Sequence, residues 1–192
     1  MTSEPDNTQV SPPETNNRSL PVVVSEIRGW IRDVFFVVGT AVMIVIFLYQ
    51  PVKVEGTSML PELKDQERIF VNKFVYRIGK ISRRDIVVFW YPRDPSKSFI
   101  KRVVGLPGDR VEIRDGVVYV NGERLDEPYL VQEFKDHKSM MPLTVDQGYY
   151  FVMGDDRKFS SDSRVWGLVP EKYIYGKAVF RYWPVSQIGS LD

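Results

Sequence analysis

The sequence has no cysteine and a single histidine, and these two shortages exclude several kinds of chemistry. Without cysteine the chain has no disulfide framework, no cysteine nucleophile and no thiolate metal site. One histidine, His137, cannot form a multi-histidine metal site, and a Ser-His-Asp triad is hard to build around it. His137 lies in the charged segment 135–138, where we expect a solvated side chain. It remains the rival candidate for a general base.

An excess of charge of one sign is also missing, because 26 basic residues stand against 25 acidic ones in a chain of 192 residues. The resulting net charge of +1 argues against the electrostatic footprint of a nucleic-acid-binding protein. Residues 1–21 contain almost no apolar side chains and are rich in Ser, Thr, Asn, Pro and Glu. Such a segment cannot bury enough surface to offset its ordering entropy, so we predict that it is disordered.

The chain has one long uncharged apolar run, the 16 residues 34–49. As a helix the run measures about 24 Å, slightly less than a bilayer core of about 30 Å, and its flanks can extend the span. It could be a cleaved signal peptide, a buried core helix or an uncleaved membrane anchor. No small-x-small cleavage site follows it and it is apolar all round, so we predict an anchor with its lead-in over 22–50. Arg18, Arg28 and Arg32 favour a cytoplasmic N-terminus, and Lys53, Lys64 and Arg68 on the far side of the run weaken this preference.

Residues 51–192 are predicted to form a mainly β, extracytoplasmic domain. Strand-like segments are 68–71, 85–91, 99–104, 110–113, 116–120, 149–153 and 177–183. The dipeptides Asp115-Gly116 and Asn121-Gly122 predict tight hairpin turns. Closely spaced strands of this kind favour antiparallel sheets in a partly closed, barrel-like domain, with 114–148 as a small subdomain.

Ser58 and Lys101 are the residues that could carry chemistry. Ser58 lies in Gly-Thr-Ser-Met-Leu-Pro, where Gly56 permits a sharp bend and Pro61 stops a regular element. Strand alternation over 99–104 places Lys101 on a face with apolar neighbours, and burial of that face would lower the pKa of its amine from about 10.4. Lys101 would then act as a general base; otherwise it is a lysine that snorkels out of an edge strand.

Four stretches in this order, behind one hydrophobic segment, resemble the motifs of the bacterial type I (leader) signal peptidases, a Ser-Lys dyad serine protease family. The stretches are Ser58-Met-Leu-Pro61, Arg84-Asp-Ile-Val-Val-Phe89, Ser98-Phe-Ile-Lys-Arg-Val-Val-Gly-Leu-Pro-Gly-Asp109 and Met153-Gly-Asp-Asp-Arg-Lys-Phe-Ser-Ser-Asp-Ser-Arg-Val-Trp-Gly167. The resemblance covers roughly residues 34–183. It implies a membrane-anchored endopeptidase that removes signal peptides after small-x-small sites.

The resemblance also implies a role for each matching residue. Ser58 would be the nucleophile and Lys101 its base, without a cofactor or metal. The supporting residues that it implies are Met59 beside the nucleophile, Arg102 beside the base, Ser160 to orient the lysine, the ion pair of Asp162 with Arg164, and Asp155. The partners that it implies are preproteins with signal peptides and the lipid bilayer, with a secretion translocon as a further candidate and no nucleic acid. The location would be the cell membrane, or a thylakoid membrane in a cyanobacterium.

Two positions depart from the family pattern. Asp156 stands where the family usually has asparagine, and a carboxylate cannot donate the hydrogen bonds of an amide. Gly56 stands where some members have a serine that helps to hold the oxyanion, so the oxyanion would rely on backbone N–H groups, chiefly that of Ser58, with Thr57 or a water as alternative further donors. Two other functions stay open: a membrane-anchored β domain that binds peptides without chemistry, and a Ser-Lys enzyme with another target, such as a self-cleaving repressor-type protease.

Overall fold

The computed structural model describes residues 20–191, and within this range the side chains of residues 20–25, 45 and 46 lie outside the description. The predicted disordered segment, 1–21, therefore falls almost entirely outside the described residues. The described chain divides into two units, one ending at Ile44 and a second, compact unit over Val45–Asp192.

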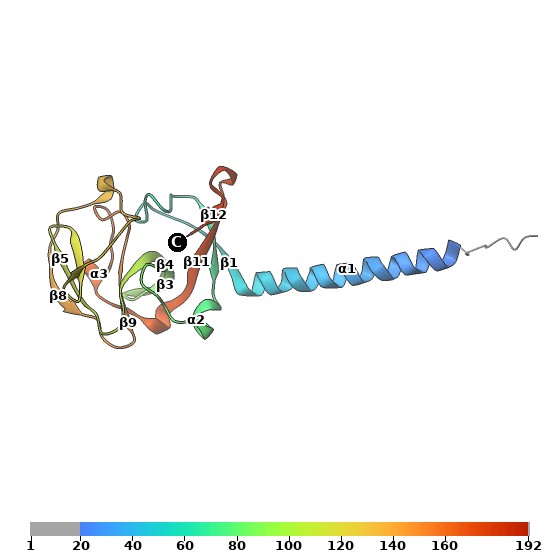
Figure 1. The fold of residues 1–192 in the computed structure, drawn as a ribbon, viewed down its shortest axis with the longest axis horizontal. Helices are drawn as coiled ribbons and strands as arrows, with labels where there is room; N and C mark the ends of the chain where they lie inside the picture. The colour runs from blue at the N-terminus through green and yellow to red at the C-terminus, as the bar shows by residue number, and fades with distance from the viewer. Residues whose placement is uncertain (1–19, 192) are drawn as a thin grey trace, which may run out of the picture. The chain divides into compact units, whose positions relative to one another are not determined.

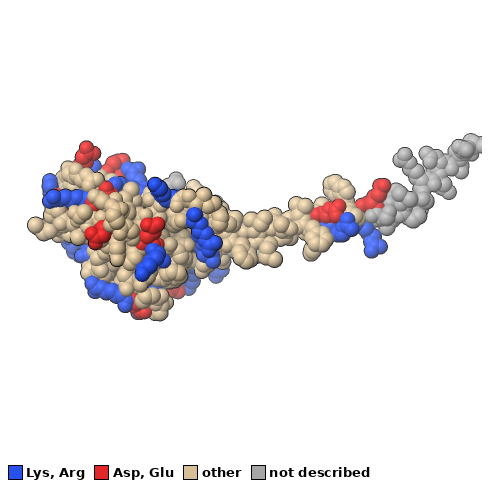
Figure 2. Space-filling view, turned by 90° about the horizontal axis from the view of Figure 1, so that it is seen from below, with Lys and Arg blue, Asp and Glu red and all other residues tan. Residues whose placement is uncertain are grey.

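Helix α1 spans Leu20–Leu48 and contains the whole apolar run except its last residue. Its charged side chains gather toward its N-terminal part, and the rest of the helix presents uncharged side chains (Figure 2). Within the described part of the chain, no helix combines the length and the apolarity needed to cross a membrane. The helix itself is present, but the predicted transmembrane anchor is not confirmed.

The compact unit consists mainly of antiparallel strands (Figure 1). The larger sheet has the order β1-β2-β11-β3-β4-β9-β10, and β12 pairs with β11. The smaller sheet has the order β7-β6-β5-β8. The strands are β1 Tyr49–Lys53, β2 Arg68–Asn72, β3 Ile86–Tyr91, β4 Asp94–Gly105, β5 Arg110–Arg114, β6 Val117–Val120, β7 Glu123–Arg124, β8 Met140–Thr144, β9 Tyr149–Met153, β10 Val169–Pro170, β11 Ile174–Trp183 and β12 Gly189–Ser190.

The mainly β, antiparallel prediction is confirmed, but the predicted barrel is not. The larger sheet has two ends, β1 and β10, and these strands do not pair with each other in the described chain. Helices of the unit are short: α2 spans Val75–Ile78 and α3 spans Ser163–Trp166. The two predicted turns form, because Asp115, Gly116, Asn121 and Gly122 all have positive φ, as a tight hairpin turn requires.

Strand β4 links the two halves of the larger sheet and has a changing set of neighbours. Along its length it pairs with β3, for example Lys101 opposite Val87. It pairs with β9 only from Arg102 onward. The edge of β4 before Arg102 that faces away from β3 therefore has no strand partner in the described residues. This stretch carries Lys101.

Alternation along the central strands sorts the buried side chains into separate cores. One core contains Met59, Leu63 and Val71, and another contains Phe89, Val103 and Trp166. A third core, with Val111, Val118 and Phe151, joins the smaller sheet to β9. Well-packed cores on both sides of β4 hold this strand in one position.

Candidate active site

Ser58 lies on the bend between β1 and β2. The ends of this bend are closed by hydrogen bonds from Val54 N to Glu67 O at 2.8 Å and from Gln66 N to Val54 O at 2.9 Å. Gly56 has a φ of 92°, which favours glycine over any residue with a side chain. Met59, the next residue after Ser58, is buried in the core. The core therefore anchors the bend, and Ser58 remains only partly buried.

Lys101 reaches Ser58 from strand β4. Its Nζ lies 2.6 Å from Ser58 Oγ and 3.0 Å from the carbonyl oxygen of Ile100. The residue is only 4% exposed, and its Nζ lies 5.5 Å from the centre of the Phe99 ring. Phe99 and Lys101 share a face of the strand, as the alternation of the sequence predicts. The arrangement places one amine against one hydroxyl in an environment with little water.

Burial lowers the pKa of Lys101 to about 8, from its ordinary value of 10.5. The negative charges of Asp162 and Asp155 oppose this shift, and the positive charge of Arg164 adds to it. The lowered pKa leaves a useful fraction of the amine neutral at mildly alkaline pH. A neutral amine within hydrogen-bond distance of a hydroxyl can accept its proton.

Arg102 points to the other face of β4 and pairs with Asp155. Its Nε and Nη2 donate to the two carboxylate oxygens at 2.9 and 2.8 Å, and both side chains are buried. The guanidinium also stacks over the Tyr129 ring at 4.1 Å. A paired, bidentate arrangement satisfies two charges that would be costly to bury singly. The pair ties β4 to the segment that follows β9.

That segment, residues 154–164, is called the site loop below. Asp162 is fully buried; its Oδ2 accepts from Gly154 N at 3.0 Å, and its Oδ1 accepts from Arg164 Nε at 2.8 Å. Burial alone would raise the pKa of Asp162, but the hydrogen bonds and charge of Arg164 outweigh it and hold that pKa below its usual value. The ionised Asp162 thus closes the loop on itself.

Ser160 lies beside Gly154, where there is no room for a larger residue. A Cβ on Gly154 would collide with the Ser160 hydroxyl and with the carbonyl oxygen of Ser58. The hydroxyl of Ser160 is buried and makes no hydrogen bond of normal geometry to any described residue, although it lies close enough to help lower the pKa of Asp162. The hydrogen bond to Lys101 that the family resemblance implies is therefore not formed here. The Lys101 amine bonds to Ser58 and to the Ile100 carbonyl instead.

Asp156 holds the site loop against the bend that carries Ser58. Its backbone N–H donates to the Ser58 carbonyl at 3.1 Å. Its carboxylate accepts from the backbone N–H groups of Lys158 and Phe159 at 3.1 and 3.2 Å. These bonds need an acceptor, and a carboxylate supplies one as well as an amide oxygen does. The departure from the family's asparagine is thereby explained.

A cleft of about 380 Å³ opens beside Ser58 and Lys101. One side is the chain from Val52 to Met59, and the other includes Ser98–Lys101, the part of β4 that has no second strand partner among residues 20–191. Phe159, which is 77% exposed, and Ser161 line the cleft from the site loop. The cleft therefore combines free strand edges, apolar side chains and the serine hydroxyl.

His137 does not lie at this cleft. It is exposed, contacts Asp115 at 3.0 Å and lines a different cavity. Among residues 20–191, no group of three or more Asp, Glu or His side chains is arranged to hold a metal ion.

The sequence reasoning missed the charged residues that support the site loop from outside. Arg157 is buried and pairs with Glu127, while Arg164 pairs with Asp136 as well as with Asp162. Arg157 lies within a stretch quoted for the resemblance, and a buried arginine needs a carboxylate partner. Nothing in the local sequence, however, marks Glu127 or Asp136 as that partner.

Comparison with known proteins identifies the family of this chain. The family described as "Signal peptidase, peptidase S26" matches residues 27–183. "Signal peptidase I" of Bacillus licheniformis is 38% identical over 172 residues, which cover 85% of this chain and 92% of that protein. "Signal peptidase I" of Bacillus amyloliquefaciens is 42% identical over 165 residues, which cover 81% of this chain and 84% of that protein.

Two further relatives come from other genera. "Signal peptidase IB" of Staphylococcus aureus is 37% identical over 185 residues, which cover 84% of this chain and 92% of that protein. The crystal structure of a signal peptidase I from Enterococcus faecalis V583 is 35% identical, covers 52% of this chain and 97% of its own, and has a TM-score of 0.46.

The protein is thus a serine peptidase, a hydrolase. More narrowly, the chain belongs to the signal peptidases of peptidase family S26, because the family matches most of its length and relatives above 30% identity cover more than four fifths of it.

Proposed function

We propose that the protein is a membrane-anchored endopeptidase that removes N-terminal signal peptides from exported preproteins, with Ser58 as nucleophile and Lys101 as general base. The observation that carries this proposal is the 2.6 Å contact between Lys101 Nζ and Ser58 Oγ at the edge of the cleft. The low exposure of Lys101 and its lowered pKa support the role of base.

The reaction is acyl transfer in two halves. Neutral Lys101 takes the hydroxyl proton as Ser58 Oγ attacks the scissile carbonyl, and the protonated lysine then gives a proton to the leaving amine. Water hydrolyses the resulting ester on Ser58, again with Lys101 as base. The developing oxyanion needs hydrogen-bond donors, and the Ser58 N–H, which has no acceptor among the described residues, is available for it.

The supporting residues act by holding this geometry. Met59 fixes the bend from the core side, and Arg102 with Asp155 fixes the neighbouring face of β4. Asp162 and Arg164 hold the site loop in place, with Ser160 beside Gly154, which itself lies against the Ser58 carbonyl. None of these side chains is needed to exchange a proton with the substrate.

The substrate is an extended peptide segment. It adds to the free edges that line the cleft, with main-chain hydrogen bonds to Val52–Glu55 or Ser98–Ile100. Side chains one and three residues before the cut then point the same way, because strand side chains alternate. Two shallow apolar pockets on that side would select small residues, as a small-x-small site requires.

The short chain between the uncharged run and Ser58 limits how far the nucleophile can lie from an anchor. Tyr49, the last residue of the uncharged run, is nine residues before Ser58, so an extended chain places the nucleophile at most about 30 Å away. If the run lies in a membrane, the cut falls close to the bilayer surface, where the signal segment of a preprotein emerges. We place the domain 51–192 outside the cytoplasm, with a translocon as a neighbour.

Cleavage of a preprotein with an Ala-x-Ala site in detergent tests the proposal. Wild type should cut it, Ser58→Ala and Lys101→Ala should lose at least a thousandfold in rate, and His137→Ala should be unaffected. If His137→Ala is inactive while Lys101→Ala keeps its activity, the assignment of Lys101 as the general base is wrong. If the folded wild type cuts nothing, a peptide-binding domain without chemistry becomes the better description.

A further inference from the structure

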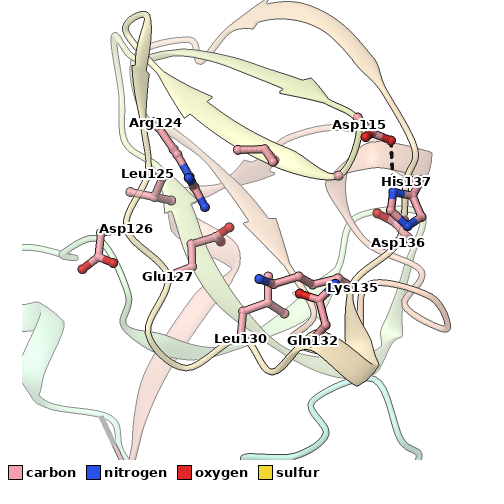
Figure 3. Close-up of a pocket in the computed structure, with 12 residues that line it drawn as sticks. Asp115, Arg124, Leu125, Asp126, Glu127, Leu130, Gln132, Lys135, Asp136 and His137 are labelled. Carbon is pink, nitrogen blue, oxygen red and sulfur yellow. Dashed lines mark hydrogen bonds and ion pairs between the residues drawn. The ribbon is translucent and has the colours of Figure 1, made fainter.

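A second cavity, of about 670 Å³, lies on the compact unit and shares no lining residue with the Ser58 cleft. Its walls are the β5–β6 turn on one side and the segment 124–137 on the other (Figure 3). Glu127 and Asp136 stand on opposite sides of this cavity. Both belong to the polar excursion that connects the strands of the smaller sheet.

Both carboxylates turn out to be partners of arginines in the site loop. Glu127 accepts two hydrogen bonds from Arg157, and the two side chains are 9% and 1% exposed. Asp136 accepts from Arg164 Nη1 at 2.9 Å, with side chains 8% and 10% exposed. Ion pairs excluded from water to this extent hold a fixed geometry far better than surface pairs do.

The two arginines also donate hydrogen bonds to backbone carbonyls of the site loop. Arg157 Nε donates to the Gly154 carbonyl at 3.1 Å, and Arg164 Nη2 donates to the Arg157 carbonyl at 3.1 Å. Arg164 also holds Asp162, which accepts from Gly154 N. These hydrogen bonds all lead to Gly154, which packs directly against the carbonyl oxygen of Ser58.

The smaller sheet in turn fixes the position of Asp136. Gly116 N donates to the Lys138 carbonyl at 2.9 Å, and Asp115 N donates to Ser139 Oγ at 3.0 Å. The carbonyl oxygen of Asp136 lies so close to Gly116 that a Cβ there would collide with it. The β5–β6 turn therefore determines where the Asp136 carboxylate meets Arg164.

We propose that Glu127 and Asp136 are positioning residues of the peptidase: they hold the site loop against Ser58 and Lys101 and transmit to it the placement of the smaller sheet. The inference rests on the proposed function of the Ser58 cleft. It gives the excursion 125–138 a role in the reaction, although neither carboxylate touches the nucleophile or its base.

The test compares Glu127→Gln and Asp136→Asn with Asp126→Asn in the full-length protein. Asp126 lines the same cavity (Figure 3), but its exposed carboxylate pairs with Arg84, outside the site loop. The first two variants should lose at least tenfold in kcat toward an Ala-x-Ala preprotein, with KM within twofold of wild type. Asp126→Asn should match wild type. A Glu127→Asp variant, which keeps the charge, should recover part of the lost kcat.

The pH profile separates positioning from general loss of structure. The charged groups that act on Lys101 are Asp162, Asp155 and Arg164, and Glu127 is not among them. A shift of the acid limb in Glu127→Gln must therefore come through the loop. We expect it to move to higher pH, because a displaced loop admits water to Lys101 and relieves the burial that lowers its pKa.

Amide hydrogen exchange of residues 155–160 provides a readout that does not depend on catalysis. Exchange there should quicken at least tenfold in Glu127→Gln and Asp136→Asn and stay unchanged in Asp126→Asn. If wild type is inactive but exchange responds in this way, the proposed function fails and the positioning role stands. The inference would be overturned if Glu127→Gln and Asp136→Asn both had the same kcat, the same pH profile and the same exchange rates as the wild type.

Discussion

Lys101 is the residue whose chemistry depends most on the fold around it. Its amine is buried beside Ser58 and Phe99, and two carboxylates and one guanidinium of the site loop act on it. Burial is the largest of these effects, so the pKa falls despite the nearby negative charges. A lysine whose amine reached the solvent would keep its ordinary pKa, because burial would no longer act on it.

The pH dependence of cleavage should report this lowered pKa. Because only the neutral amine can accept the proton, kcat/KM should fall about tenfold per pH unit below the lysine pKa of about 8. The measurement is a profile of kcat/KM on an Ala-x-Ala peptide from pH 5 to 9. An acid limb near pH 6.5, the ordinary pKa of histidine, that disappears in His137→Ala would contradict the account.

Lys101→Met should make the protein inactive but more stable. The folded pKa of about 8 lies below the ordinary value of 10.5, so the buried ammonium destabilises the fold by about 3 kcal/mol below pH 8. This cost fades as pH rises from 8 to 10.5. Thermal unfolding at pH 6.5 should thus favour the variant, and the difference should vanish near pH 10.5. Equal stability at both pH values would mean that Lys101 is not strongly desolvated.

For single residues, the sequence predicted Ser58 and Lys101 at the cleft, but it did not predict the ion pairs that surround them. Ser58 and Lys101 stand in ordered motifs, and alternation predicts the face on which Lys101 lies. The partners Glu127 and Asp136 are 30 and 28 residues from their arginines. An ion pair across such a separation leaves no local periodicity or turn signal, so only the folded chain reveals it.

The site loop, 154–164, is the element that brings these residues together. It contacts Ser58 through Asp156, β4 through Asp155, and the excursion through Arg157 and Arg164. Its close approach to the Ser58 bend depends on a glycine at position 154. The loop can therefore adjust little without moving the groups at the cleft.

Gly154→Ala should reduce activity at least tenfold and destabilise the fold by about 1–3 kcal/mol, because its Cβ would overlap Ser160 and the Ser58 carbonyl. Gly189→Ala is the matched control, since a Cβ at Gly189 meets nothing within 4 Å. Cleavage rates and thermal unfolding of both variants would check this. An active, stable Gly154→Ala protein would show that the loop packs less closely on Ser58 than described.

The strands that sequence reasoning found and missed differ in their position in the sheets. Strands next to Asp115-Gly116 and Asn121-Gly122 were predictable because these dipeptides fix a hairpin. Strands β1 and β8 were missed, and each contains a proline, Pro51 and Pro142. Both strands lie at the end of their sheet, where a missing N–H is tolerated. A proline argues against a central strand, so edge strands of this kind escape prediction.

On the scale of the whole molecule, every residue assigned to the site lies in the compact unit 45–192. The prediction that a membrane anchor precedes this unit rested mainly on the uncharged run 34–49. The mainly β character followed from the spacing of short strands, whereas barrel closure depends on pairing between strands that are distant in sequence. Spacing does not encode that pairing, and the two end strands of the sheet remain apart.

A protein shortened to residues 45–192 should keep its activity toward a short Ala-x-Ala peptide within about tenfold, because its cores and ion pairs are retained. It should also lose its association with lipid vesicles if 34–49 is the anchor. Vesicle sedimentation and peptide cleavage of both forms would check these two expectations separately. A shortened protein that sediments as fully as the complete chain would contradict the anchor.

The central claim is that Ser58 becomes acylated and that Lys101 makes this happen. The measurement is mass spectrometry of the protein after acid quenching during turnover of an ester substrate with an Ala-x-Ala acyl part. We expect the acyl group on the peptide that contains Ser58 in wild type and His137→Ala, and none in Lys101→Ala. An adduct on another residue, or undiminished acylation of Ser58 in Lys101→Ala, would contradict the Ser58–Lys101 dyad.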